Sequence, residues 1–130
     1  MIDFQIYLSQ RFSGLRDARK GSVFFVEHGL GDDELEDLRE VVRASLRVHP
    51  LESDWWDKHD LALLVAAAEV GYRYRGAGTD FWPLLEEELR VELPPPCRQR
   101  LKDLFENATG RVRGVRPPAT AWAHAFHLIA

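Results

Sequence analysis

The sequence predicts an all-α protein, a compact orthogonal bundle of five to seven helices that forms a single domain over residues 1–130. Three observations support this fold class. Apolar residues recur at three- and four-residue spacing in most segments, as they do on one face of a helix. Proline and glycine separate these segments, and only two short stretches alternate as strands do. Hydrophobic residues make up 45% of the 130-residue chain, which is enough to build a buried core.

The first two segments have an ambiguous periodicity. In 2–12, "IDFQIYLSQRF", the residues Ile2, Phe4, Ile6 and Leu8 alternate as in a strand, yet a short helix fits the segment better. Segment 22–30, "SVFFVEHGL", has too few apolar residues to define a period. We expect it to form a short helix that ends at Gly29.

The clearest helix covers 32–49. Its apolar stripe is formed by Leu35, Leu38, Val41, Val42 and Leu46. Asp32 or Asp33 can cap its start, arginines lie near its end, and Pro50 terminates it.

The next helix is expected to begin near Ser53 or Asp54 and to continue to about residue 74. Between Leu61 and Ala68 it is apolar on nearly every face, which predicts the central and most buried helix. Its first turn, residues 57–60 with the sequence "DKHD", is expected on the surface.

Three further helices are expected in the C-terminal half. One follows Thr79 or Asp80, carries Pro83 in its first turn and ends before the "LPPPC" stretch at 93–97. Another covers 95–110 and stops at Gly110. The last begins after Thr120 and is still apolar at Ala130, which predicts an N-terminal fragment of a longer chain.

Composition limits the possible settings of the protein. The net charge of −4 disfavours nonspecific binding to nucleic acid and to anionic membranes. No apolar run is long enough for a membrane-spanning helix, and the N-terminus does not resemble a signal peptide. The single cysteine, Cys97, excludes an intrachain disulfide. We therefore expect a cytoplasmic protein with no membrane partner.

Motifs for catalysis or cofactor binding are not found. The glycine stretch at 71–79, "GYRYRGAGT", has Ala77 where a phosphate loop needs lysine, and a helix precedes it instead of a strand. His124 and His127 are spaced to face one ion. A zinc site needs three or four ligands, however, and the single cysteine, Cys97, has no second thiol near it. No cofactor and no metal are predicted, and a noncatalytic role is favoured over an enzyme.

Buried polar residues are the remaining candidates for chemistry. Glu27, His28 and Glu69 stand in apolar surroundings, where a carboxylate needs hydrogen-bond partners or becomes protonated. A structural role is favoured for them. An enzyme built on these residues would require them to converge in a cleft.

Nucleic-acid binding is the alternative function. Tyr72 and Tyr74 alternate with Arg73 and Arg75, which suits stacking on bases and binding of phosphates, although cations and tyrosines are also common at a helix end. The stretch "GRVRGVRPP" adds further cations. The residues proposed to contact nucleic acid are Arg73, Arg75, Arg111, Arg113 and Arg116.

The segments "VFFVEHGL", "AAEVGYRYRGAGTDFWPLLEEE" and "AWAHAFHLIA" together resemble the N-terminal helical region of large bacterial proteins associated with phage-defence or mobile-element loci. The resemblance covers about residues 22–130, departs from that pattern at "RVELPPPC" and implies no catalytic residue. It rests on Glu27, His28, Gly29, Leu30, Glu69, Gly71, Tyr72, Phe81, Trp82 and Trp122.

The function predicted from the sequence is therefore a noncatalytic interaction or assembly module of a larger bacterial protein. Its partner would be another protein or the remainder of the same chain. Large apolar side chains would form the contact. The candidates are Trp55, Trp56, Phe126, Leu128 and Ile129.

Overall fold

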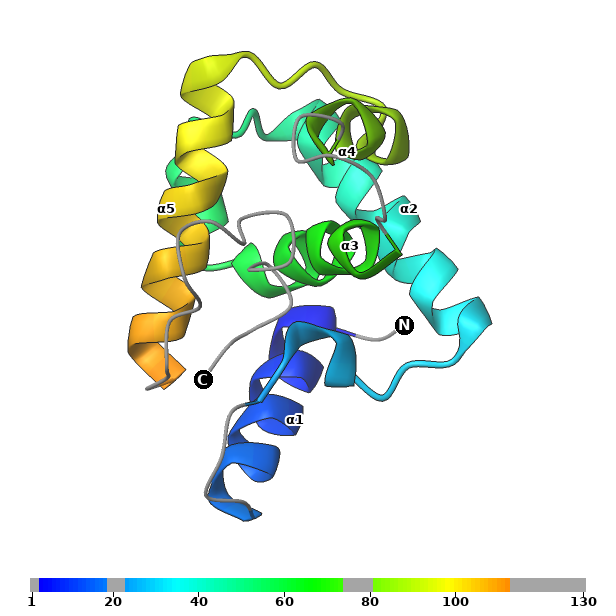
Figure 1. The fold of residues 1–130 in the computed structure, drawn as a ribbon, viewed down its shortest axis with the longest axis vertical. Helices are drawn as coiled ribbons and strands as arrows, with labels where there is room; N and C mark the ends of the chain where they lie inside the picture. Colours follow the sequence, from blue (N-terminus) through cyan, green and yellow to red (C-terminus); the bar gives the residue numbers. More distant parts are fainter. Residues whose placement is uncertain (1–2, 19–22, 74–80, 113–130) are drawn as a thin grey trace.

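The computed structural model of the protein describes residues 3–18, 23–73 and 81–112, with side chains undescribed at 72–73 and 109–112. Within these ranges the protein is all-α and has no β-strand, which confirms the predicted fold class. No helix of the described part is long and apolar enough to cross a membrane. Figure 1 shows the order of the elements, which are α1 Phe4–Ala18, the 3₁₀ helix η1 Phe25–Glu27, α2 Asp32–Val48, the 3₁₀ helix η2 Asp54–Asp57, α3 Asp60–Arg73, α4 Phe81–Leu89 and α5 Pro95–Val112.

Helix α3 lies at the centre of the bundle and contacts α1, η1, α2, α4 and α5. Its residues 61–68 are all buried, as the continuous apolar run predicts. In Figure 1 the axis of α3 crosses those of α1 and α5 steeply, so the bundle is orthogonal rather than parallel. The hydrophobic core consists of side chains from all the other elements packed around this one helix.

The prediction of one continuous helix from about residue 53 to 74 is wrong in one respect, because the segment forms two helices, η2 and α3. Gln5 of α1 contacts the chain where α3 begins. Its Oε1 accepts a hydrogen bond from Leu61 N–H at the start of α3, and its Nε2 donates to Asp60 Oδ1. Asp60, which the sequence placed on the surface, is completely buried. A side chain distant in sequence thus satisfies one of the first backbone N–H groups of the central helix.

Helix α2 has the predicted apolar stripe, with one correction. Four of its members are buried in the core, whereas Val41 is 39% exposed. The N-cap is Gly31 rather than an aspartate, and the Glu34 side chain accepts the Gly31 N–H.

The two ambiguous N-terminal segments are both helical. In α1, Phe4, Leu8 and Phe12 are buried at a spacing of four residues, which the alternation at the start of the segment concealed. The "SVFFVEHGL" segment forms only the single turn η1, and Gly29 follows it with a φ of 74°. A side chain at Gly29 would be strained by this φ and would meet the Arg11 side chain at 3.1 Å.

Helices α4 and α5 occupy the predicted segments, and Leu85 and Leu89 of α4 are buried whereas Leu84 is 43% exposed. Helix α4 ends at Leu89 in a Schellman-type turn, in which Arg90 has a φ of 55° and Val91 N–H donates to Glu86 O. Helix α5 continues beyond the predicted stop at Gly110 to Val112. The helix predicted after Thr120 lies outside the described residues.

Candidate functional site

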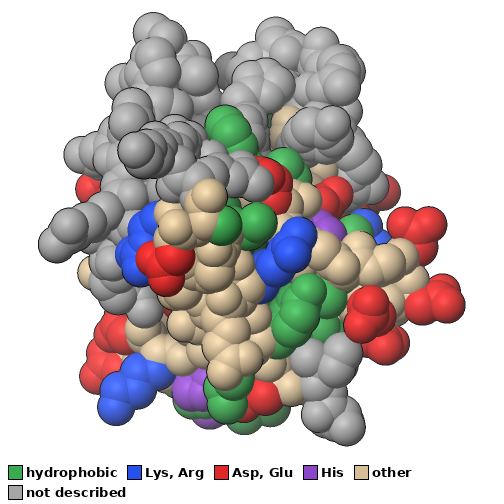
Figure 2. All heavy atoms as spheres, turned by 90° about the horizontal axis from the view of Figure 1, so that it is seen from below, with side chains coloured by type: hydrophobic (Ala, Val, Ile, Leu, Met, Phe, Trp, Pro, Cys, Tyr) green, Lys and Arg blue, Asp and Glu red, His purple; other side chains and the backbone are tan. Residues whose placement is uncertain are grey.

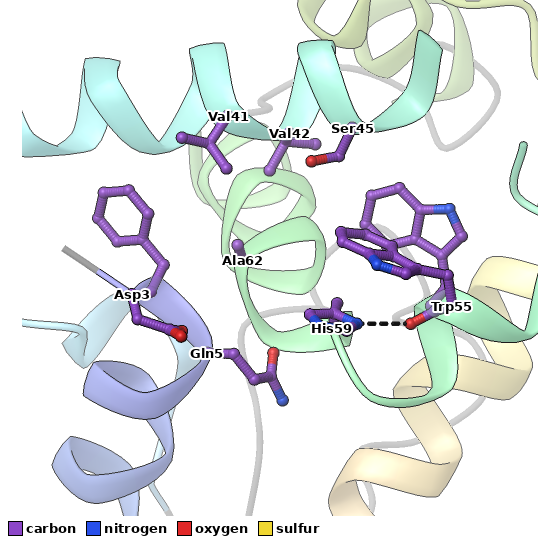
Figure 3. Close-up of a pocket in the computed structure, with 10 residues that line it drawn as sticks. Asp3, Gln5, Val41, Val42, Ser45, Trp55, His59 and Ala62 are labelled. Carbon is purple, nitrogen blue, oxygen red and sulfur yellow. Dashed lines mark hydrogen bonds between the residues drawn. The ribbon is translucent and has the colours of Figure 1, made fainter. Parts of the chain in front are cut away.

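A half-open apolar pocket lies where α1, α2, η2 and α3 meet, and it encloses about 200 Å³. Figure 3 shows side chains of α2 along one side, those of α1 opposite and those of η2 at one end. Most of the lining is carbon, from aromatic and aliphatic side chains. The lining residues are Asp3, Phe4, Gln5, Val41, Val42, Ser45, Trp55, Trp56, His59 and Ala62.

Trp55 is held between two histidine rings. The ring of His49 stacks on one side with centroids 4.3 Å apart and an interplanar angle of 3°. The ring of His59 stacks with a centroid distance of 3.9 Å and an angle of 7°. Because a carbonyl oxygen only accepts, His59 Nδ1–H donates to Trp55 O at 2.8 Å (Figure 3). The indole that lines the pocket is therefore fixed in orientation.

Trp56 packs edge-on against Trp55, with ring centroids 4.8 Å apart. Its Nε1–H donates to His49 O at 2.8 Å, and only 1% of the residue is exposed. Trp56 is thus a core residue that also lines the pocket, so it offers a partner far less surface than the sequence suggests. Trp55 remains half-buried. The other predicted contacts, Phe126, Leu128 and Ile129, lie outside the described residues.

Arg100 of α5 joins η2 to the rest of the bundle. Its Nε donates to Leu51 O at 3.0 Å and its Nη2 to Ser53 O at 3.2 Å. The same Nη2 forms a 3.0 Å ion pair with Asp57 Oδ1. One guanidinium thus holds both the approach to η2 and its last residue, which fixes the end of the pocket that contains Trp55.

His28 and Glu69, two of the predicted buried polar residues, form a hydrogen-bonded pair. Nε2 of His28 lies 2.8 Å from Glu69 Oε1, and His28 is 5% exposed. Leu30 N–H donates to His28 Nδ1 at 2.9 Å, so the ring proton is on Nε2 and is donated to the carboxylate. Both ring nitrogens are therefore engaged within the fold.

Glu27, the third of these residues, bonds to the backbone of its own turn. Its Oε1 accepts a hydrogen bond from Phe24 N–H at 3.0 Å, which closes the turn of η1. The neighbouring backbone is held from α1, since Tyr7 Oη–H donates to His28 O and Arg11 Nε–H donates to Glu27 O. These contacts favour a structural role for the Glu-His-Gly-Leu turn.

The basic residues of α5 that the structure describes are engaged within the fold. Arg98 Nε donates to Leu93 O at 2.7 Å, and its guanidinium lies 5.5 Å from the centroid of the Trp82 ring. Lys102 Nζ lies 5.9 Å from the same ring. The side chains of the five arginines proposed to contact nucleic acid, Arg73, Arg75, Arg111, Arg113 and Arg116, lie outside the described residues.

Among the described residues, no three His, Cys, Asp or Glu side chains converge as metal ligands do. Cys97 is half-buried and its Sγ lies 3.3 Å from Glu52 Oε1. Burial, together with this hydrogen bond and the adjacent negative charge, raises the pKa of the Cys97 thiol. A raised thiol pKa lowers the thiolate fraction and with it the nucleophilicity of the cysteine.

Sequence reasoning missed most of the pocket. Its lining residues come from α1, α2, η2 and α3 or lie directly beside them, and they are brought together only by the crossing of helices. The one available signal was the tryptophan pair with a histidine on each side in sequence, His49 and His59. Comparison with protein-family models, with curated proteins and with solved structures finds no match to this chain.

Proposed function

We propose that the protein is a noncatalytic helical interaction domain, and that its contact surface includes the apolar pocket beside Trp55. The observation that carries this proposal is the preformed state of the pocket. The lining side chains Gln5, Trp55 and Trp56 are each fixed by hydrogen bonds or ring stacking within the fold. A fixed apolar pocket binds a partner group at a lower cost in conformational entropy than a flexible one.

The His28–Glu69 pair supports a noncatalytic role. General acid–base catalysis by histidine needs a ring nitrogen within hydrogen-bond reach of a reacting group. In this protein one nitrogen of His28 accepts from Leu30 N–H and the other donates to Glu69. The pair therefore acts as a buried connection between α3 and the turn after η1.

The resemblance to the N-terminal helical region of large bacterial proteins gives this proposal its context. A domain of that kind would bind a protein partner or the remainder of its own chain, and the associated loci would connect it with antiviral defence.

Self-association of the isolated chain tests the proposal, because an apolar contact surface without its partner tends to pair with a second copy. Val41 lines the pocket and is 39% exposed. We expect the 130-residue chain to associate as its concentration is raised in sedimentation velocity. The substitution Val41→Asp should weaken that association about tenfold or more, since it buries a charge at the contact.

The matched control is Val48→Asp on the same helix. Val48 is 72% exposed and does not line the pocket. The control should associate as the unsubstituted chain does. A chain that stays monomeric at millimolar concentration, or equal effects of the two substitutions, would contradict the proposal.

A further inference from the structure

The pocket is shaped to hold one large side chain. Its volume of about 200 Å³ exceeds the roughly 150 Å³ of an apolar cavity that holds a benzene ring and lies below the roughly 300 Å³ at which drug-sized ligand sites begin. Val41, which lines the pocket, is 39% exposed, so apolar surface of α2 faces solvent at the edge of the pocket. A free small molecule would leave this outer surface uncovered, whereas a polypeptide would cover it.

The charge at the pocket is negative. Asp3 is part of the lining, and its carboxylate accepts Ile6 N–H at the start of α1. Asp37 is exposed and precedes Val41 by one helical turn, so it extends the same ridge of α2. Neither aspartate has an ion-pair partner among the described residues. Figure 2 shows acidic side chains at both edges of the face it presents, with more of them at the right.

Arg39 and Arg43 of α2 do not neutralise these two aspartates, because both arginines are already paired with glutamates. Arg39 forms ion pairs with Glu36 and with Glu88 of α4. Arg43 pairs with Glu36 and Glu40, and its Nε donates to Glu88 O.

From these contacts we propose that the pocket binds one large apolar side chain of a basic polypeptide segment, whose flanking lysines or arginines lie over Asp3 and Asp37. This inference rests on the proposed function and specifies the chemistry of the partner. The side chain supplies apolar burial, and the cations supply selectivity and faster association.

Short capped peptides with one phenylalanine test the inference, because they carry no tryptophan and leave the fluorescence of the protein as the readout. The phenylalanine is flanked by lysines, by serines or by glutamates. At low salt we expect the lysine peptide to bind about tenfold more tightly than the glutamate peptide, with the difference shrinking as salt is added.

Two pairs of variants locate the effect. Ser45→Leu fills the pocket and should lower affinity for the lysine peptide about tenfold, whereas Ala44→Leu, at an exposed neighbour outside the lining, should leave it unchanged. Thermal unfolding of both variants shows whether the fold is retained. The double variant Asp3→Asn with Asp37→Asn removes both negative charges and should reduce the preference for the lysine peptide to about threefold. The start of α1 should be retained, since asparagine is also a good N-cap. Glu87→Gln on α4 is the charge control.

The outcomes separate this inference from the proposed function. If the three peptides bind equally and Ser45→Leu abolishes their binding, the pocket is a contact site but the claim that its partner is basic is wrong. If phenethylamine binds as tightly as the lysine peptide, the claim that the ligand is a polypeptide and not a small molecule is wrong. Failure of every peptide to bind overturns the inference, while the sedimentation experiment with Val41→Asp still decides the proposed function.

Discussion

At the scale of single residues, the environment of Glu69 decides its role. The sequence indicates a charge set into an apolar helix, and the structure gives that carboxylate the Nε2–H of His28 as a hydrogen-bond partner. We expect Glu69→Ala to lower the free energy of unfolding by about 1–3 kcal/mol, because the buried N–H loses this acceptor. Urea unfolding followed by circular dichroism measures the change. The exposed Glu87→Ala should stay within about 0.5 kcal/mol of the unsubstituted protein, and an equal effect of the two would contradict the assigned role.

At the scale of elements, η2 depends on a guanidinium from a helix about fifty residues away in sequence. Arg100 bonds to Leu51 O, Ser53 O and Asp57. We expect Arg100→Met to cost about 1.5–3 kcal/mol in urea unfolding, the range for hydrogen bonds to charged groups. Tryptophan fluorescence should also change, since Trp55 and Trp56 lie on η2. Arg100→Lys keeps the charge but loses the planar fork, so its loss should be intermediate. Unchanged fluorescence in Arg100→Met would show that η2 does not need this contact.

At the scale of the whole molecule, charge distinguishes the two candidate functions. The net charge is −4, and Arg98, Arg100 and Lys102 are engaged within the fold. For the interaction domain we expect no shift of single- or double-stranded DNA at 150 mM salt. Affinity at low salt that falls steeply as salt is raised would instead support the nucleic-acid alternative. In that case, replacing Arg111, Arg113 and Arg116 by alanine should reduce the salt dependence.

Much of the fold could be predicted from the sequence because the information is local. Apolar periodicity identified α2, and the unbroken run from Leu61 to Ala68 identified the central helix. Local patterns were insufficient where a distant group intervenes. No local pattern indicates that Asp60 is buried or that Gln5 of α1 bonds to Asp60 and Leu61 at the start of α3.

The sequence by itself determined the helical class, the order of the helices and the central position of α3, because backbone propensity and periodic burial act between near neighbours. Only the tertiary structure decided that Glu69 meets His28, that Trp56 is buried while Trp55 is half-exposed, and that Asp3 and Val41 line one pocket. These pairings join residues from helices that cross steeply, and no spacing along the chain encodes which side chains meet at a crossing.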